Sequence, residues 1–271
     1  MSLNSFLKAG VTAALLMGSA CALADGTANF ASDISVGAAP DYTLSTAQGG
    51  QVYGYNSCFH ATAPCIPGSP TYDGSNDWHF YYAPPAWYVT EFDEFALMEG
   101  TYGPIGAPGI YYGLTLTAPN TLTKGVAQKL SVSDAKYVLV KMGNFCGPVG
   151  CKGPTAANVL TIVLSNGTNT PTVNQDPHTD PTTTALCSAS VTLAGTGDGI
   201  DVGPTSTNRL HAMFTYKVNL KEFKCSKGTL AKATSGLTAV SVEVRQDKNV
   251  DAMSVGDELE MVAVSRVSFG K

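Results

Sequence analysis

The chain has 271 residues, 16 of them basic and 21 acidic, which gives a formal net charge of −5. An acidic chain without a dense basic stripe repels phosphate, so nucleic-acid binding is not expected. Hydrophobic residues make up 44% of the chain and charged residues only 14%, while glycine and proline number 28 and 15. This composition is typical of many short strands joined by uncharged turns.

Residues 1–24 have the pattern of a secretory signal peptide. A short polar start contains Lys8, an apolar run spans 9–17, and small residues lead up to Ala24. The apolar run is much shorter than the roughly 20 residues of a membrane-spanning helix. We expect export after cleavage at Ala24, with no transmembrane segment; acylation at Cys21, as in a lipoprotein, is the alternative.

Charge is divided unevenly along the expected mature chain. Residues 25–123 contain no lysine or arginine and nine acids, whereas residues 124–271 contain fifteen basic and twelve acidic residues. The two parts therefore have net charges of −9 and +3. The acids of the first part must face water, bind cations, or meet a basic surface of this or another subunit. They are Asp25, Asp33, Asp41, Asp73, Asp77, Glu91, Asp93, Glu94 and Glu99.

Aromatic residues divide the chain near the same place, since twelve of the 24 lie between Tyr72 and Tyr112. Glycine and proline interrupt every periodic run before residue 112, which predicts a loop-rich region over 25–112, packed on a main domain formed by 113–271. A helical turn is expected near 91–98.

The best candidate binding segment is 72–100, where aromatic rings and carboxylates are mixed. Flat rings stack on sugars while carboxylates accept hydroxyl hydrogen bonds, and Tyr and Trp are also favoured anchors of protein interfaces. A third interpretation is an aromatic mini-core covering one end of the sheets. The predicted binding residues are Trp78, Tyr81, Tyr82, Trp87, Tyr88, Glu91, Asp93 and Glu94.

From residue 111 onward the pattern is regular and predicts an all-β antiparallel sandwich or jelly roll. Within 240–245, for example, three valines alternate with Ser241, Glu243 and Arg245, as in a half-buried strand. The last strand does not show clearly which face it buries. The predicted strands are 111–117, 127–132, 136–142, 159–164, 188–193, 210–220, 238–245 and 258–269.

Six cysteines remain after removal of the signal peptide, and an even number in an exported chain predicts disulfides. Zinc binding is the alternative, but six and four intervening residues within the two closest pairs do not match zinc-site spacing. Proximity favours the pairs Cys58–Cys65, Cys146–Cys151 and Cys187–Cys225.

No cofactor is firmly implied. Calcium is a candidate because two glycine-containing turns supply closely spaced oxygens, from Asp73 and Asp77 and from Asp198 and Asp201. Asx turns without metal explain both turns equally well.

Histidines suggest weaker metal sites. His60 and His79 could share a metal or an acid–base role, and His211 with Met213 suits copper. The simpler interpretation of each is structural.

Two functions remain open. The leading hypothesis is an exported, non-enzymatic protein that presents an acidic aromatic surface to a protein partner or to another copy. The alternative is an extracellular glycan-binding protein or a glycoside hydrolase that uses a carboxylate pair from 72–99.

Overall fold

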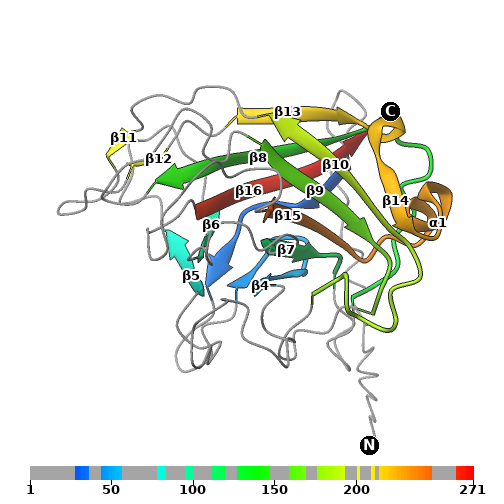
Figure 1. Ribbon diagram of the computed structural model, residues 1–271, viewed down its shortest axis with the longest axis horizontal. Coiled ribbons are helices and arrows are strands. Elements are labelled where there is room, and N and C mark those ends of the chain that lie inside the picture. The colour runs from blue at the N-terminus through cyan, green and yellow to red at the C-terminus, as the bar shows by residue number, and fades with distance from the viewer. Residues whose placement is uncertain are drawn as a thin grey trace, which may run out of the picture.

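The computed structural model describes residues 28–36, 44–56, 78–83, 95–100, 111–119, 127–146, 159–168, 176–192, 200–201, 209–210, 214–245 and 261–271. The described strands form two eight-stranded sheets, here called sheet A and sheet B (Figure 1). Every strand pairing given for these residues is antiparallel. The predicted all-β antiparallel sandwich is confirmed.

Sheet A is built around its two longest strands, β8 and β16, which pair along most of their length. On the far side of β8 lie β12 and β13, and on the far side of β16 lie β1 and β6, with β5 beyond β6. Its strands are β1 (Ala28–Ala31), β5 (Trp78–Ala83), β6 (Phe95–Gly100), β8 (Tyr137–Cys146), β11 (Ile200–Asp201), β12 (Arg209–Leu210), β13 (Phe214–Asn219) and β16 (Met261–Gly270).

Sheet B runs in the order β14-β10-β9-β15-β7-β4-β3-β2. Strands from both halves of the sequence therefore lie in each sheet. Its strands are β2 (Ser35–Val36), β3 (Leu44–Ser45), β4 (Gln51–Asn56), β7 (Tyr111–Thr117), β9 (Val159–Ser165), β10 (Leu186–Thr192), β14 (Lys224–Lys227) and β15 (Ala239–Arg245).

The buried hydrophobic residues of the described strands form one core between the two sheets. Sheet B contributes residues of one parity from each strand, such as Leu114, Ile162 and Val242, while sheet A contributes residues such as Val140 and Phe269. All five are buried. This is the alternation expected of strands that turn one face toward a packed interior.

β16 contains a bulge that explains its ambiguous sequence pattern. The pairing with β8 shifts register between Val264 and Arg266, so Val264 and Val267 are both buried although they differ by three positions. An extra residue in one strand reverses the alternation beyond it. Ser265 occupies the bulge and is itself buried.

Most predicted strands match the structure, and three expectations need correction. Residues 127–132 form no strand, since Leu130 makes only an isolated bridge to Leu237. The predicted helical turn near 91–98 is wrong over its second half, because Phe95–Gly100 form β6 between β5 and β16. β15 is not half-buried, because Ser241 and Glu243 are 1% and 0% exposed.

The segment 214–235, here called the lysine strap, connects the two sheets. It passes from β13 through a 3-10 turn, η2 (Leu220–Glu222), to β14, and then to the helix α1 (Leu230–Ser235). Asn219 and Thr229 cap the turn and the helix by accepting hydrogen bonds from backbone N–H groups. In Figure 1, β14 and α1 lie at one end of the long axis and β5 and β6 lie toward the other.

A disulfide between Cys187 and Cys225 fixes the lysine strap to sheet B, joining directly paired residues of β10 and β14. This confirms one of the three predicted pairs. Among the others, Cys146 ends β8, and Cys58, Cys65 and Cys151 lie outside the described residues. No described helix is long and apolar enough to cross a membrane.

Candidate functional site

The structure places part of the predicted binding segment on sheet A. Trp78, Tyr81 and Tyr82 belong to β5, which pairs with β6 and ends the path of the sheet. His79 lies in the same strand. The remaining predicted binding residues, Trp87, Tyr88, Glu91, Asp93 and Glu94, lie outside the described part of the chain.

Most residues of the predicted metal sites also lie outside the described part of the chain. Asp201 belongs to the short strand β11. The described residues contain no group of three or more His, Cys, Asp or Glu placed to hold a metal ion. Calcium and copper binding stay predictions. Asp73, Asp77 and Asp198 of the calcium prediction, His211 and Met213 of the copper prediction, and His60, which was paired with His79, are not among the described residues.

The best-defined polar site lies on the outer face of sheet B, opposite the hydrophobic core. There Tyr55, Gly113, Glu243 and Thr161 form one cross-strand row over β4, β7, β15 and β9. Tyr55, Thr161 and Glu243 are at most 2% exposed. Both faces of sheet B are therefore buried here, one apolar and one polar.

Gly113 allows Tyr55 to reach across β7 to Glu243. The phenol of Tyr55 donates a 2.5 Å hydrogen bond to Oε1 of Glu243. A methyl group at position 113 would lie 2.6 Å from the ring of Tyr55 and 2.9 Å from Cγ of Glu243. The ring thus occupies the space that a side chain on β7 would fill, as aromatic residues do over glycines in sheets.

His178 contacts the same carboxylate from the segment before β10. Its Nε2 lies 2.6 Å from Oε1 of Glu243. An ionised carboxylate can only accept hydrogen bonds, so beside the ionised form of Glu243 the proton lies on Nε2. The imidazole side chain is 20% exposed while that of Glu243 is fully buried. The pair therefore connects a buried anion to a group that solvent can reach.

Asp176 forms a second link two residues before His178. Tyr111 of β7 donates a 2.6 Å hydrogen bond from its phenol to Oδ2, and the backbone N–H of His178 donates to Oδ1 at 2.8 Å. The rings of Tyr111 and His178 lie with their centroids 4.6 Å apart. We call Tyr55, Tyr111, Asp176, His178 and Glu243 the Tyr–Asp–His–Glu cluster.

Burial shifts the acidity of two members of the cluster. It raises the pKa of the Tyr55 phenol well above its ordinary value, and the charges of Glu243 and Asp176 act in the same direction. Burial also raises the pKa of Asp176, while hydrogen bonds from Tyr111 and His178 partly oppose the rise. Tyr55 is therefore a hydrogen-bond donor at every physiological pH.

Several hydroxyl groups beside the cluster have no hydrogen-bond partner among the described residues. Among the described residues, the side-chain oxygens of Tyr53, Thr161 and Thr183 are buried and make no hydrogen bond. Thr161 is paired directly with Glu243. Unpartnered buried hydroxyls cost free energy or hold ordered water, so this interface is less well satisfied than the core.

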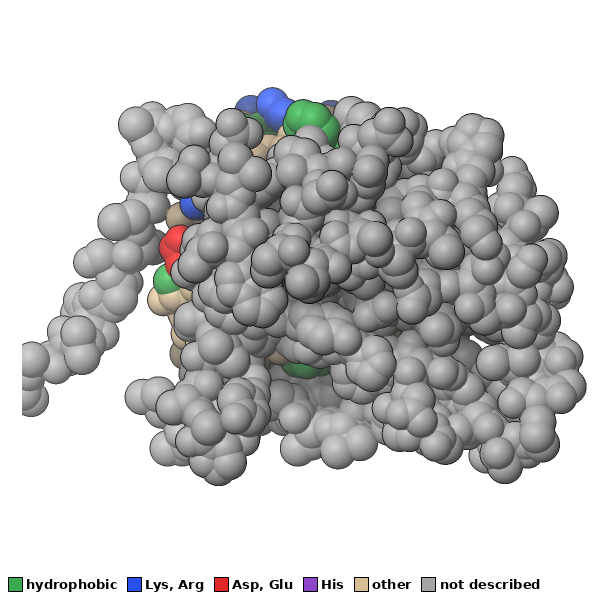
Figure 2. Space-filling model, turned by 90° about the vertical axis from the view of Figure 1, so that its left-hand side faces the viewer, with side chains coloured by type: hydrophobic (Ala, Val, Ile, Leu, Met, Phe, Trp, Pro, Cys, Tyr) green, Lys and Arg blue, Asp and Glu red, His purple; other side chains and the backbone are tan. Residues whose placement is uncertain are grey.

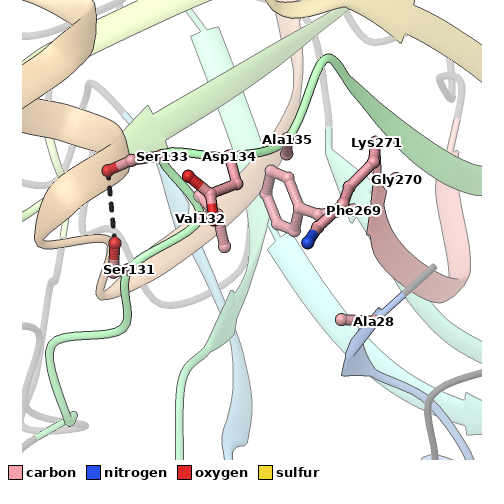
Figure 3. Close-up of a pocket in the computed structure, with 9 residues that line it drawn as sticks. All are labelled: Ala28, Ser131, Val132, Ser133, Asp134, Ala135, Phe269, Gly270 and Lys271. Atoms are coloured by element: carbon pink, nitrogen blue, oxygen red, sulfur yellow. Dashed lines mark hydrogen bonds between the residues drawn. The ribbon is translucent and has the colours of Figure 1, made fainter. Parts of the chain in front are cut away.

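A separate cavity of about 170 Å³ lies where the turn at 131–135 meets the end of β16 (Figure 3). Val132 and Phe269 form an apolar wall of the cavity. At its rim, the hydroxyl oxygens of Ser131 and Ser133 lie 3.2 Å apart. The side chains of Ser131, Ser133 and Asp134 are exposed, so these groups keep their hydration. Nothing in this arrangement selects a ligand.

Side chains of the described residues appear at the margins of the face shown in Figure 2. Basic and hydrophobic groups are visible along its upper edge and an acidic group at its left. Charged side chains of the described residues are therefore visible only at the rim of this face.

No protein-family model matches the sequence, and no curated protein matches it. The chain is similar in structure to a protein of Bacteroides thetaiotaomicron described as a "putative glycoside hydrolase", with a TM-score of 0.33 and 11% sequence identity. The alignment covers 88% of this chain and 69% of that chain. A similarity at this level supports no functional argument.

Few sequence features point to the Tyr–Asp–His–Glu cluster. Glu243 lies 188 residues from Tyr55 and 65 from His178. The available signals were a glutamate alternating with valines in a strand and a glycine within the strand 111–117, which marks a place where another group approaches the backbone. Neither signal identifies the partners.

Proposed function

We propose that this chain is an exported, non-enzymatic β-sandwich protein that binds another copy of itself end to end. The observation on which this rests is the separation of two unlike ends. β14 and α1 of the lysine strap lie at one end of the long axis, while its first strand, β13, runs back toward the middle. β5 and β6 of the acidic, aromatic segment lie in the other half of the molecule (Figure 1).

The lysine strap forms a strongly basic surface. Residues 214–235 contain five lysines and one acid, a net charge of +4. The lysines, all of them exposed, are Lys217, Lys221, Lys224, Lys227 and Lys232.

The segment that contains β5 and β6 has the complementary charge in its sequence. β5 and β6 are flanked by Asp77 and by Asp93 with Glu94, and Glu99 lies within β6. No lysine or arginine occurs between residues 25 and 123. Complementary charges on two separate surfaces of one molecule favour head-to-tail association, which builds either a ring or an open filament.

β5 also supplies a strand edge. Among the described strands, β5 pairs only with β6 and has no partner on its other side. Strands at sheet edges are usually protected by lysine, as in β14, whereas β5 has the sequence WHFYYA. An aromatic edge strand without lysine or proline suits addition of a strand from a partner.

Export is supported by the pattern of residues 1–24 and by the Cys187–Cys225 disulfide, because disulfides persist in oxidising compartments.

Sedimentation velocity of the oxidised chain from Asp25 onward tests the proposal over a range of about 0.05 to 0.5 M NaCl, which spans strong to weak screening. We expect assemblies at low salt that dissociate as salt rises. Charge reversal by Lys224→Glu with Lys227→Glu should reduce assembly, while Lys224→Arg with Lys227→Arg should preserve it. A monomer at every concentration and salt level would overturn self-assembly.

The acidic end has its own test. Asp93→Asn with Glu94→Gln should weaken assembly as the strap reversal does. Asp134→Asn, which removes an exposed acid from the 131–135 turn, is the matched control and should assemble like the unmodified chain.

Glycan binding is the second candidate, because the edge strand β5 contains four aromatic residues. Screening the intact chain and its Trp78→Ala variant on a glycan array separates the two functions. Binding that Trp78→Ala abolishes would favour the glycan, and absence of binding to any glycan would exclude it.

A further inference from the structure

We propose that His178 and Glu243 form a pH-dependent clasp that holds the segment 176–185 against the polar outer face of sheet B. The clasp tightens when the imidazole is protonated and loosens when it is neutral. This inference is independent of the proposed self-assembly, since every residue on which it depends lies within the Tyr–Asp–His–Glu cluster and its surroundings.

The clasp joins two parts of the chain that are far apart in sequence. Glu243 belongs to β15, an interior strand of sheet B, while His178 belongs to the segment that precedes β10. Their side chains meet at 2.6 Å. Breaking this contact releases the side chain of His178 from sheet B without breaking any strand pairing.

Other contacts attach the segment at its two ends. At the start, Tyr111 donates to Asp176. At the end, the side chain of Asn166 accepts hydrogen bonds from the backbone N–H groups of Thr184 and Ala185, at 2.9 and 2.6 Å. Thr182 is held as well, since its hydroxyl accepts a 2.8 Å hydrogen bond from the backbone N–H of Thr168. The clasp therefore governs the part between Asp176 and Thr182, and the segment stays tethered when the clasp opens.

The charges around the imidazole determine the direction of the pH effect. The titratable groups that face it are Glu243 from β15, Tyr55 from β4 through the shared oxygen, Tyr111 from β7, and Asp176 from its own segment. The two phenols are neutral hydrogen-bond donors to the carboxylates. The protonated imidazole is thus the cation of the cluster among the described residues.

Burial makes the protonation state matter. Glu243 is 0% exposed, so its charge has little contact with water. A buried carboxylate is stabilised most by a charged donor and much less by a neutral one. Imidazole is the side chain that ordinarily gains or loses its charge between about pH 5 and 8. As pH rises through this range the clasp loses its positive charge and weakens.

The interface beneath the segment 176–185 contains buried hydroxyls that make no hydrogen bond with the described residues. The buried hydroxyls of Tyr53 and Thr183 make no hydrogen bond among the described residues, and Thr161 beside Glu243 makes none. A region with unsatisfied polar groups opens at a lower free energy than the hydrophobic core. Opening of the segment therefore does not require global unfolding.

Hydrogen exchange of the full oxidised mature chain, read by mass spectrometry on peptides covering 177–183, tests the clasp. After correction for intrinsic exchange, protection should be about tenfold greater near pH 5.5 than near pH 8, the difference between a charge-assisted and a neutral hydrogen bond. Peptides from β9 and β15 should change little. Equal protection at the two pH values would overturn the proposal.

Two glutamate variants provide the matched comparison. Glu243→Gln keeps an acceptor oxygen for Tyr55 and His178 but removes the charge, so the pH dependence of exchange in 177–183 should fall to less than about twofold. Glu222→Gln alters an exposed glutamate in η2 and should retain the dependence of the unmodified chain. The same pH dependence in Glu243→Gln and the unmodified chain would reject the clasp.

A second measurement does not depend on a variant that folds. Imidazole nitrogen chemical shifts of the unmodified chain, followed by NMR from about pH 5 to 8.5, report the titration of His178 directly. The exchange of 177–183 should follow the same midpoint. If the midpoint of exchange differs from that of the imidazole, another group controls the segment.

Discussion

Gly113 is the residue on which the Tyr55–Glu243 contact depends. Any side chain there would collide with both partners, at 2.6 and 2.9 Å. Gly113→Ala should therefore lower the free energy of unfolding by about 2 kcal/mol, in the range of overpacked sites. Urea denaturation measures the effect. Gly236→Ala, where an added methyl meets nothing closer than 3.8 Å, is the control and should stay within about 0.5 kcal/mol.

The buried carboxyl of Asp176 should make the free energy of unfolding depend on pH in a definite direction. Burial raises its pKa in the folded state above the ordinary 3.8. Between 3.8 and the raised value the folded chain binds more protons than the unfolded chain, so the free energy of unfolding falls as pH rises through this window. Asp176→Asn should flatten this slope.

Urea unfolding at several values between about pH 3.5 and 6 would measure the slope. The exposed Asp134→Asn is the control and should retain it. A slope unchanged in Asp176→Asn would show that other carboxyl groups dominate in this range.

At the residue scale, the sequence predicted the wrong environment for Glu243. Alternation with valines correctly placed it on the face opposite the core, but that face is covered, so Glu243 is buried. Periodicity reports which face a residue occupies and not what lies above it. The partners that satisfy the carboxylate come from β4 and from the segment before β10, which no local pattern connects.

Among the elements, strands with clear alternation were predicted closely. The prediction 111–117 coincides with β7, and 159–164 with β9 apart from its last residue. The predicted strand 127–132 fails because a single bridge at Leu130 replaces a continuous ladder. The helix α1, of six residues, is too short to show a helical period, although Thr229 before it is a typical N-cap.

The disulfide that joins β10 and β14 leads to a prediction about an element. It closes a loop with a sequence separation of 38 residues. Replacing both cysteines by alanine should lower the free energy of unfolding by about 3–4 kcal/mol, mainly by increasing the freedom of the unfolded chain. Chemical denaturation measures this. Thr192→Ala, an exposed change in β10, should have almost no effect.

At the scale of the whole molecule, the structure predicts an order of local opening. β9 and β15 lie inside sheet B with partners on both sides, and their core-facing residues are fully buried. Their amides should exchange only on global unfolding, whereas those of the two-residue strands β11 and β12 should exchange much faster. Residue-resolved hydrogen exchange checks this order. Equal protection of β12 and β15 would contradict it.

The Cys187–Cys225 bond lies where mechanical load on the lysine strap would enter sheet B. If copies of the chain are linked through this strap, tension along the assembly reaches β14 first, and β14 is a four-residue strand that hydrogen bonds alone would release by unzipping. The covalent bond passes that tension directly into β10 and the interior of sheet B. Under load, an oxidised assembly would therefore separate between its copies before the strap peels from its own sheet.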